Sequence, residues 1–332
     1  MNYFCTLFDS FYLNRVIVMY QSLKKHCPEF HLYIFPFDND ALKILHELNL
    51  ENVTLISLQE FENENLLAVK PTRTKGEYCW TCTSFTIDYC LSRFNLPHCT
   101  YVDSDLYFYD DPTVLLNEIG PGSVLITEHR YTRRYDQSST SGIYCVQFIT
   151  FLNNKEGRLV LHWWRDRCLE WCFARFEEGK FGDQKYLDDW PVRFEGVRVL
   201  RHLGGGVAPW NIQQYNLFHK EGKWFMRYKK TKRIYPLIFF HFHYIKFFDD
   251  GTINLSDIYN LGYKSVLNLY KEYLVQIVFI NDELLKRFSF SIRTSPRHPR
   301  SRLYKLAKAI FNRYQRLYGL YNNINLKSFT YW

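Results

Sequence analysis

The chain has 332 residues and a formal net charge of +8, and 47% of its residues are hydrophobic and 19% aromatic. That length exceeds one ordinary domain, so an α/β core of roughly 240–260 residues with an appendage fits best. There is no apolar run of about 20 residues, which argues against a membrane-spanning helix. Residues 1–7 lack the features of a secretory signal, so we expect a cytoplasmic protein.

Strand and helix patterns alternate over the first sixty residues. The apolar runs at 2–8, 30–36 and 53–58 predict buried strands, and the spacing of apolar side chains at 13–26 and 40–48 predicts helices. This β-α-β-α-β order favours a parallel sheet with helices on its faces.

The alternation continues to about residue 250. Glycines 204–206 predict a flexible loop, which is not a P-loop because no Gly-Lys-Ser/Thr follows. Further helices are predicted at 78–94 and 156–175. Further strands are predicted at 99–102, 124–127, 142–151 and 237–243. We therefore predict one α/β domain over residues 1–250.

Nine cysteines are spread along the chain, mostly within apolar patterns. Cys79 and Cys82 form a CxxC pair, but no second pair of Cys or His residues completes a four-ligand zinc site. We interpret the cysteines as reduced core residues.

An acidic pair follows a short apolar strand. Asp103-Ser104-Asp105 comes directly after the predicted strand 99–102, and ligands of open α/β sheets bind beyond the carboxyl ends of strands. Carboxylates suit Mn²⁺ or Mg²⁺, whose coordination is often completed by substrate phosphates. The alternative is a solvated turn, because turns are rich in Asp. Acids beside a buried strand are costly without a cation, which favours a metal site.

Several segments, in this order, resemble glycosyltransferase family 8 of the GT-A glycosyltransferases. They are Phe8-Asp9-Ser10-Phe11-Tyr12, Tyr101-Val102-Asp103-Ser104-Asp105-Leu106, Gly182-Asp183-Gln184-Lys185-Tyr186-Leu187, Trp210-Asn211 and His241-Phe242-His243-Tyr244-Ile245-Lys246. The resemblance covers roughly residues 1–250. It implies a GT-A (Rossmann-like), mostly parallel sheet with flanking helices, and metal-dependent transfer from a nucleotide-sugar with retention of configuration.

The resemblance also implies roles for individual residues. A divalent metal, Mn²⁺ or Mg²⁺, would be held by Asp103, Asp105 and His241, with His243 as the alternate ligand. The donor would be bound by Thr6, Asp9, Tyr12, Ser104, Trp210, Asn211 and Lys246, with Tyr12 stacking on the base and Lys246 on the diphosphate. Asp183 and Gln184 would lie near the sugar and its anomeric carbon as the catalytic pair. The structural alternatives are a helix N-cap for Asp9, a core aromatic for Tyr12 and a core histidine for His241.

The chain departs from the family pattern in three places. Lys185 stands where an acid is usual, and Tyr244 replaces a glycine in a His-to-Lys segment that is one residue short. The N-x-G element after the acidic pair has no clean match, with Ser141-Gly142 or Gln147 as stand-ins. We identify no general base, in keeping with a mechanism that needs no dedicated one.

The net positive charge is concentrated at the C-terminal end. From Lys286 onward there are 11 Lys or Arg and no Asp or Glu, so residues 1–285 carry 8 − 11 = −3. A helix is predicted over 263–288 and a basic amphipathic helix over 301–318. We therefore predict a helical, basic extension over residues 251–332.

We expect residues 286–332 to dock on an anionic membrane surface, which would place the protein at the inner face of the cytoplasmic membrane. A packed helix with a solvated cationic face is the alternative. Nucleic acid is not expected as a partner, because no known binding module accompanies the charge.

The function that follows is transfer of a hexose-type sugar from a nucleotide-sugar, with UDP as the family-based choice, to a glycan or lipid-linked glycan in polysaccharide biosynthesis. A nucleotidylyltransferase is one alternative, but it would want a glycine-rich, basic loop that residues 6–12 lack. A non-catalytic, membrane-associated protein of the same fold is another. The joint presence of Asp103, Asp105, His241 and Lys246 argues against it.

Overall fold

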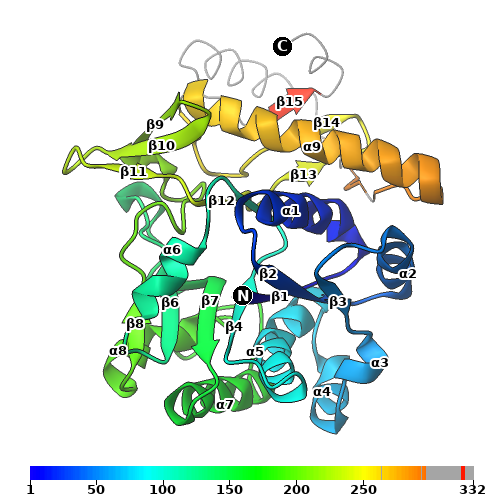
Figure 1. Cartoon of the computed structure of the whole chain (residues 1–332), viewed down its shortest axis with the longest axis vertical. Coiled ribbons are helices and arrows are strands. Elements are labelled where there is room, and N and C mark those ends of the chain that lie inside the picture. The colour runs from blue at the N-terminus through cyan, green and yellow to red at the C-terminus, as the bar shows by residue number, and fades with distance from the viewer. Residues whose placement is uncertain (263, 293, 297–322, 326–332) are drawn as a thin grey trace.

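The computed structural model describes residues 1–262, 264–292, 294–296 and 323–325, and these contain a central seven-stranded sheet (Figure 1). Its strand order is β3-β2-β1-β4-β7-β6-β8. The strands are β1 (Asn2–Phe8), β2 (Phe30–Pro36), β3 (Val53–Leu55), β4 (His98–Val102), β6 (Val124–Glu128), β7 (Tyr144–Leu152) and β8 (Val197–Val199). β7 runs antiparallel to both of its neighbours, and the other pairings in this sheet are parallel. The predicted α/β, mostly parallel sheet is therefore confirmed.

Helices cover both faces of this sheet. On one face lie α1 (Leu13–His26) and α2 (Asn39–Leu48), and on the other α5 (Lys75–Arg93) and α7 (Lys155–Glu170) (Figure 1). Alternation along β1 explains the two cores: Phe4 and Phe8 belong to the first, and Cys5 and Leu7 to the second. The sheet is thus buried on both sides.

Three predicted boundaries around the central sheet were wrong, two of them because a capping box starts a helix. The strand predicted at 53–58 ends at Leu55, because Ser57 and Glu60 form a capping box that starts α3 (Leu58–Phe61). The helix predicted from 78 begins at Lys75, after a second capping box made by Thr74 and Glu77. The helix predicted to run to 175 ends at Glu170.

Shorter helices connect these elements: α4 (Glu64–Val69), α6 (Thr113–Leu116), α8 (Trp190–Arg193), and the 3-10 turns η1 (Ser10–Tyr12), η2 (Lys70–Thr72), η3 (Asn117–Ile119), η4 (Arg133–Tyr135), η5 (Lys185–Asp189) and η6 (Ile212–Gln214). None of the helices in the described ranges combines the length and apolar character that crossing a bilayer requires.

A second layer of small sheets lies beyond the central one. The strand predicted at 237–243 is shorter, β12 (Phe239–His241), and it pairs with β5 (Leu106–Phe108) instead of the central sheet. The remaining strands are β9 (Tyr215–Lys220), β10 (Lys223–Tyr228), β11 (Ile234–Pro236), β13 (Lys246–Phe247), β14 (Thr252–Asn254) and β15 (Asn323–Asn325). Pairing of β5 with β12 places two segments of the site next to each other.

The long helix α9 (Lys264–Phe288) lies across α1 (Figure 1). Its apolar side chains join the core that contains α1, and Tyr273 stacks on Phe242 with ring centroids 3.9 Å apart. Asn14 of α1 also donates a hydrogen bond to Asn281. The basic helix predicted at 301–318 lies outside the described residues.

Candidate functional site

A cavity of about 500 Å³ opens beyond the carboxyl ends of β1 and β4. Most of the sequence-predicted site residues line it: Asp9, Tyr12, Asp103, Ser104, Asp105, Asp183, Gln184, Trp210, His241 and His243. Thr6, Asn211 and Lys246 are not part of the lining. The parallel arrangement of β1 and β4 explains this convergence, because their carboxyl ends meet at one edge of the sheet.

The acidic pair is held between β7 and β12. The backbone N–H of Asp103 donates to the carbonyl of Gln147 at 3.0 Å, and the carbonyl of Asp105 accepts the N–H of Phe242 at 3.0 Å. His241 Nε2 then lies 3.0 Å from Asp105 Oδ1 and 3.7 Å from Asp103 Oδ2. The imidazole of His241, which is distant in the sequence, therefore lies close to both carboxylates.

The two carboxylates of this group carry more negative charge than the single imidazole of His241 can neutralise. Burial, together with the charge of Asp105, raises the pKa of Asp103 to about 6, although His241 opposes this shift. Burial opposes ionisation of Asp105 as well, but His241 lowers its pKa to about 2. Burial works against the imidazolium of His241, yet the two carboxylates hold its pKa well above the usual value.

The donor set fits a divalent cation. Oxygen and imidazole ligands suit first-row divalent ions and Mg²⁺. His241 Nδ1 lies 2.8 Å from Gln147 Oε1, which orients the ring so that Nε2 faces the carboxylates, as outer partners do in metal sites. The amide nitrogen of Gln147 is buried without a hydrogen-bond partner.

The glycine run forms a loop, as predicted, but this loop is buried and supports β12. Gly204, Gly205 and Gly206 are all buried, and a Cβ on Gly204 would lie 2.0 Å from the carbonyl oxygen of Pro236. The carbonyl of Gly204 accepts the N–H groups of Ile238 and Phe239. Glycine is needed here for close backbone approach.

Asn211 lies behind the cavity wall. Its side-chain amide donates to the carbonyls of His129 and Gly206, and its oxygen accepts the N–H of Ala208. These bonds close the turn that carries Trp210, whose ring packs edge-on against His241 at 5.4 Å between centroids.

A tight turn carries Asp183 and Gln184, which also line the cavity. Gly182 has φ +52 and packs on Trp80, where a Cβ would lie 3.3 Å from the indole. Burial and the charge of Asp103 raise the pKa of Asp183 to about 7. Gln184 is fixed by a 2.7 Å bond to the carbonyl of Ser141.

Lys185, which replaces the usual acid, does not line the cavity. Its Nζ donates to the carbonyl of Ser138 and to Asp188 Oδ2, each at 2.7 Å. The lysine therefore holds the loop beside the site, which explains how this departure is accommodated.

The first βα turn forms another part of the cavity wall. Asp9 caps η1 by accepting the N–H of Phe11 at 3.1 Å, as its structural alternative required, and it also lines the cavity. Tyr12 lies under the guanidinium of Arg15, 4.4 Å from the ring centroid. Arg15 is buried and donates to the carbonyls of Phe11 and Ile245.

Sequence reasoning missed Arg15, although a basic residue among the apolar positions of helix 13–26 was a signal. It also missed much of the lining, including Lys75, Trp80 and Tyr259. Lys75 stands in the first turn of α5, and neither its spacing nor its neighbours distinguish it from a surface lysine.

A larger cavity of about 1220 Å³ lies beside the edge strand β8. Tyr131 lines both cavities, so the two are neighbours. None of the predicted site residues lines the larger cavity, and we therefore place the chemistry in the smaller one.

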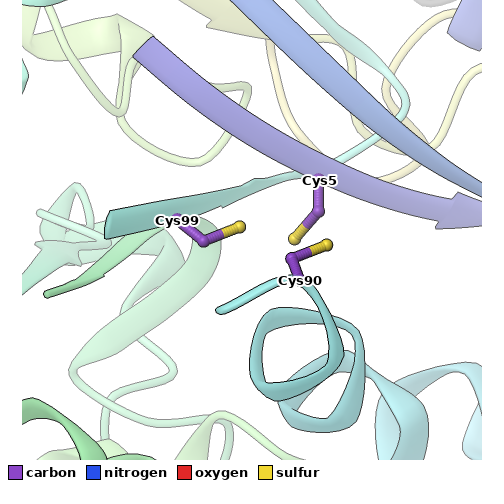
Figure 2. Close-up of side chains that lie close together, drawn as sticks. All are labelled: Cys5, Cys90 and Cys99. Atoms are coloured by element: carbon purple, nitrogen blue, oxygen red, sulfur yellow. The ribbon is translucent and has the colours of Figure 1, made fainter. Parts of the chain in front are cut away.

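A second group of potential ligands lies within the core. Cys5 of β1, Cys90 of α5 and Cys99 of β4 point toward one another, with sulfur atoms within 4.8 Å (Figure 2). All three are fully buried, and no fourth His, Cys, Asp or Glu in the described part of the chain joins them. Structural zinc sites use four ligands, so we assign these thiols to core packing, as predicted for the cysteines.

Comparison with known proteins agrees with this architecture. The structure is similar to that of the galactosyltransferase LgtC in complex with donor and acceptor sugar analogs, with a TM-score of 0.52 at 12% sequence identity, over 83% of this chain and 95% of that one. The chain thus has the GT-A fold of glycosyltransferases. No model of a known protein family matches it.

Two sequence relatives come from Bacillus subtilis (strain 168). YfnD, an uncharacterized protein, is 30% identical over 302 residues, which cover 89% of this chain and 95% of YfnD. YfnF is 29% identical over 284 residues, covering 83% of this chain and 92% of YfnF. The chain belongs to the same family as YfnD.

Proposed function

We propose that this chain is a metal-dependent glycosyltransferase of the family 8 type. It would transfer a hexose-type sugar, with retention, from a UDP-sugar to a glycan or lipid-linked glycan. The observation that carries the proposal is the convergence of Asp103, Asp105 and His241 in the cavity that Tyr12 and Asp183 also line. The GT-A fold supports it.

Each group has a defined task in this reaction. Asp103, Asp105 and His241 would hold Mn²⁺ or Mg²⁺, which when bound would supply positive charge to offset that of the diphosphate leaving group. Tyr12, braced by Arg15, offers its ring to the base. Lys246, whose Nζ lies 4.8 Å from the centroid of the cavity-lining Tyr244 ring, supplies a cation for the diphosphate.

Asp183 and Gln184 face the sugar. Preorganised dipoles and charges lower a barrier when they are fixed where charge develops, and both residues are held by the turn at Gly182. A carboxyl whose pKa is raised to about 7 is well suited to exchange a proton or hydrogen bond with a sugar hydroxyl.

The test is nucleotide-sugar hydrolysis with and without Mn²⁺ across a donor panel. We expect Asp105→Ala to lose turnover by more than about a hundredfold, since it removes electrostatic stabilisation of the leaving group. The matched control is Asp110→Ala, whose carboxylate binds Lys223 outside the cavity. If wild type neither binds nor turns over any donor, and metal makes no difference, the proposal fails.

We also propose that residues 286–332 dock the enzyme on an anionic membrane, with residues 1–250 as the catalytic domain. The support is the excess of 11 cationic residues with no acid in that segment. Truncation at Ser289 retains α9 and its packing on α1. It should abolish binding to phosphatidylserine liposomes and spare donor hydrolysis, whereas unchanged liposome binding would contradict the idea.

A further inference from the structure

Two imidazoles lie close to Asp105, just after β4, whereas the family resemblance implies one metal-binding histidine. His241 ends β12 and His243 follows two residues later, and their ring centroids lie 5.3 Å apart. One ligand atom from each of Asp105, His241 and His243 lies within 4.8 Å of the other two. The second imidazole is therefore close enough to share an ion with the first.

The fold holds His243 in this position. The N–H of Phe242, between the two histidines, donates to the carbonyl of Asp105 at 3.0 Å, so this backbone is bonded to the acidic loop itself. Trp210 packs edge-on against both rings, at 5.4 Å for His241 and 5.3 Å for His243. Tyr244 then adopts φ +69, in the left-handed region, and turns the chain away.

We propose that His241 and His243 ligate the divalent cation together with Asp105, and that this set favours Mn²⁺ or Co²⁺ over Mg²⁺. The inference rests on the proposed function, because the cation is that of the sugar-transfer site. Imidazole ligands suit transition ions, whereas Mg²⁺ prefers oxygen ligands and retains water. A second imidazole thus shifts the preference of the site away from Mg²⁺.

The first experiment measures the Kd values of the full-length chain for Mn²⁺, Co²⁺ and Mg²⁺ by calorimetry, in the presence of UDP. In His243→Phe, which keeps a ring against Trp210, we expect at least about tenfold weaker binding of Mn²⁺ and Co²⁺ and less than about threefold change for Mg²⁺. The matched control is His129→Phe, because His129 also packs edge-on against Trp210, at 5.3 Å, but is outside the ligand group. It should keep the wild-type preference.

The second experiment does not depend on any variant. Pulsed EPR of Mn²⁺-loaded wild type should detect two coordinated imidazole nitrogens, and His243→Phe should retain one. A single nitrogen in wild type, or an unchanged Co²⁺ to Mg²⁺ preference in folded His243→Phe, would overturn the inference.

The two proposals fail in different ways. Donor turnover without any metal binding leaves the transfer activity in place, but it overturns both the metal dependence and the two-imidazole site. Two coordinated nitrogens without turnover of any donor support the site and overturn the transferase.

Discussion

Asp183 gives a direct test of the site's electrostatics, because it is a buried acid whose ionisation works against folding. Burial and the charge of Asp103 raise its pKa from 3.8 to about 7. The folded state therefore holds a proton that the unfolded state releases between about pH 4 and 7. Stability falls as pH rises through that window and is level above it.

The magnitude follows from the size of this shift. Three pKa units correspond to about 4 kcal/mol at 1.36 kcal/mol per unit, and loss of the side-chain hydrogen bonds in Asp183→Asn offsets about 1–2 kcal/mol. We expect the variant to be about 2–3 kcal/mol more stable than wild type at pH 8 and no more stable near pH 4.5. If Asp183 faces the sugar, the same variant should lose donor turnover.

The assay is urea unfolding in EDTA from pH 4.5 to 8. Asp189→Asn is the matched control: that carboxylate is half exposed and paired with Arg193, so its replacement should change stability by less than about 1 kcal/mol at any pH. Parallel wild-type and Asp183→Asn curves over this range would refute the reasoning.

Two further predictions concern backbone packing and the donor base. Gly204→Ala should lower the unfolding free energy by about 1–3 kcal/mol or more, because the added Cβ would meet the carbonyl of Pro236. The control Gly76→Ala, whose Cβ would meet no atom within 4 Å, should be neutral or up to about 1 kcal/mol more stable. Equal melting temperatures of the two variants would contradict this prediction. Tyr12→Ala should weaken UDP binding by about 1–3 kcal/mol through lost stacking, and Arg15→Met by less, as measured by calorimetry. Unchanged UDP affinity in Tyr12→Ala would exclude a stacking role.

The periodicity of apolar residues was sufficient to predict much of the fold. The apolar runs of β1 and β2 and the helical spacing of α1 predicted these elements because each buries a regular face. Two helix starts could also have been read from sequence, since Ser57 with Glu60 and Thr74 with Glu77 have the capping-box spacing.

Pairing was not predictable in the same way. Nothing in the apolar pattern of β7 distinguishes an antiparallel strand from a parallel one, because strand direction depends on the connections before and after it. The pairing of β12 with β5 is decided by contacts between residues more than 130 positions apart, which local propensity does not encode.

Site residues could be predicted where a chemically reactive side chain stands at a position in the sequence that is typical of binding sites. Acids at the end of a buried strand marked Asp103 and Asp105. Residues that act by shape gave no such signal: Arg15 braces Tyr12 from inside a helix, and Asn211 closes a turn from behind the cavity. Their importance depends on what they touch in three dimensions.

The distribution of thiols has a practical consequence for following this protein in solution. All nine cysteines are free. Eight are buried, including Cys145 in the cavity wall, whereas Cys79 also lines the cavity and is only partly buried. Burial, with the charge of Asp9, raises the pKa of Cys79 to about 12, so even this thiol should alkylate slowly. Under native conditions a thiol reagent should therefore modify one sulfur at a rate that cavity occupancy slows. It should reach the other eight only as fast as the fold opens, so one labelling experiment reports both ligand binding and global opening.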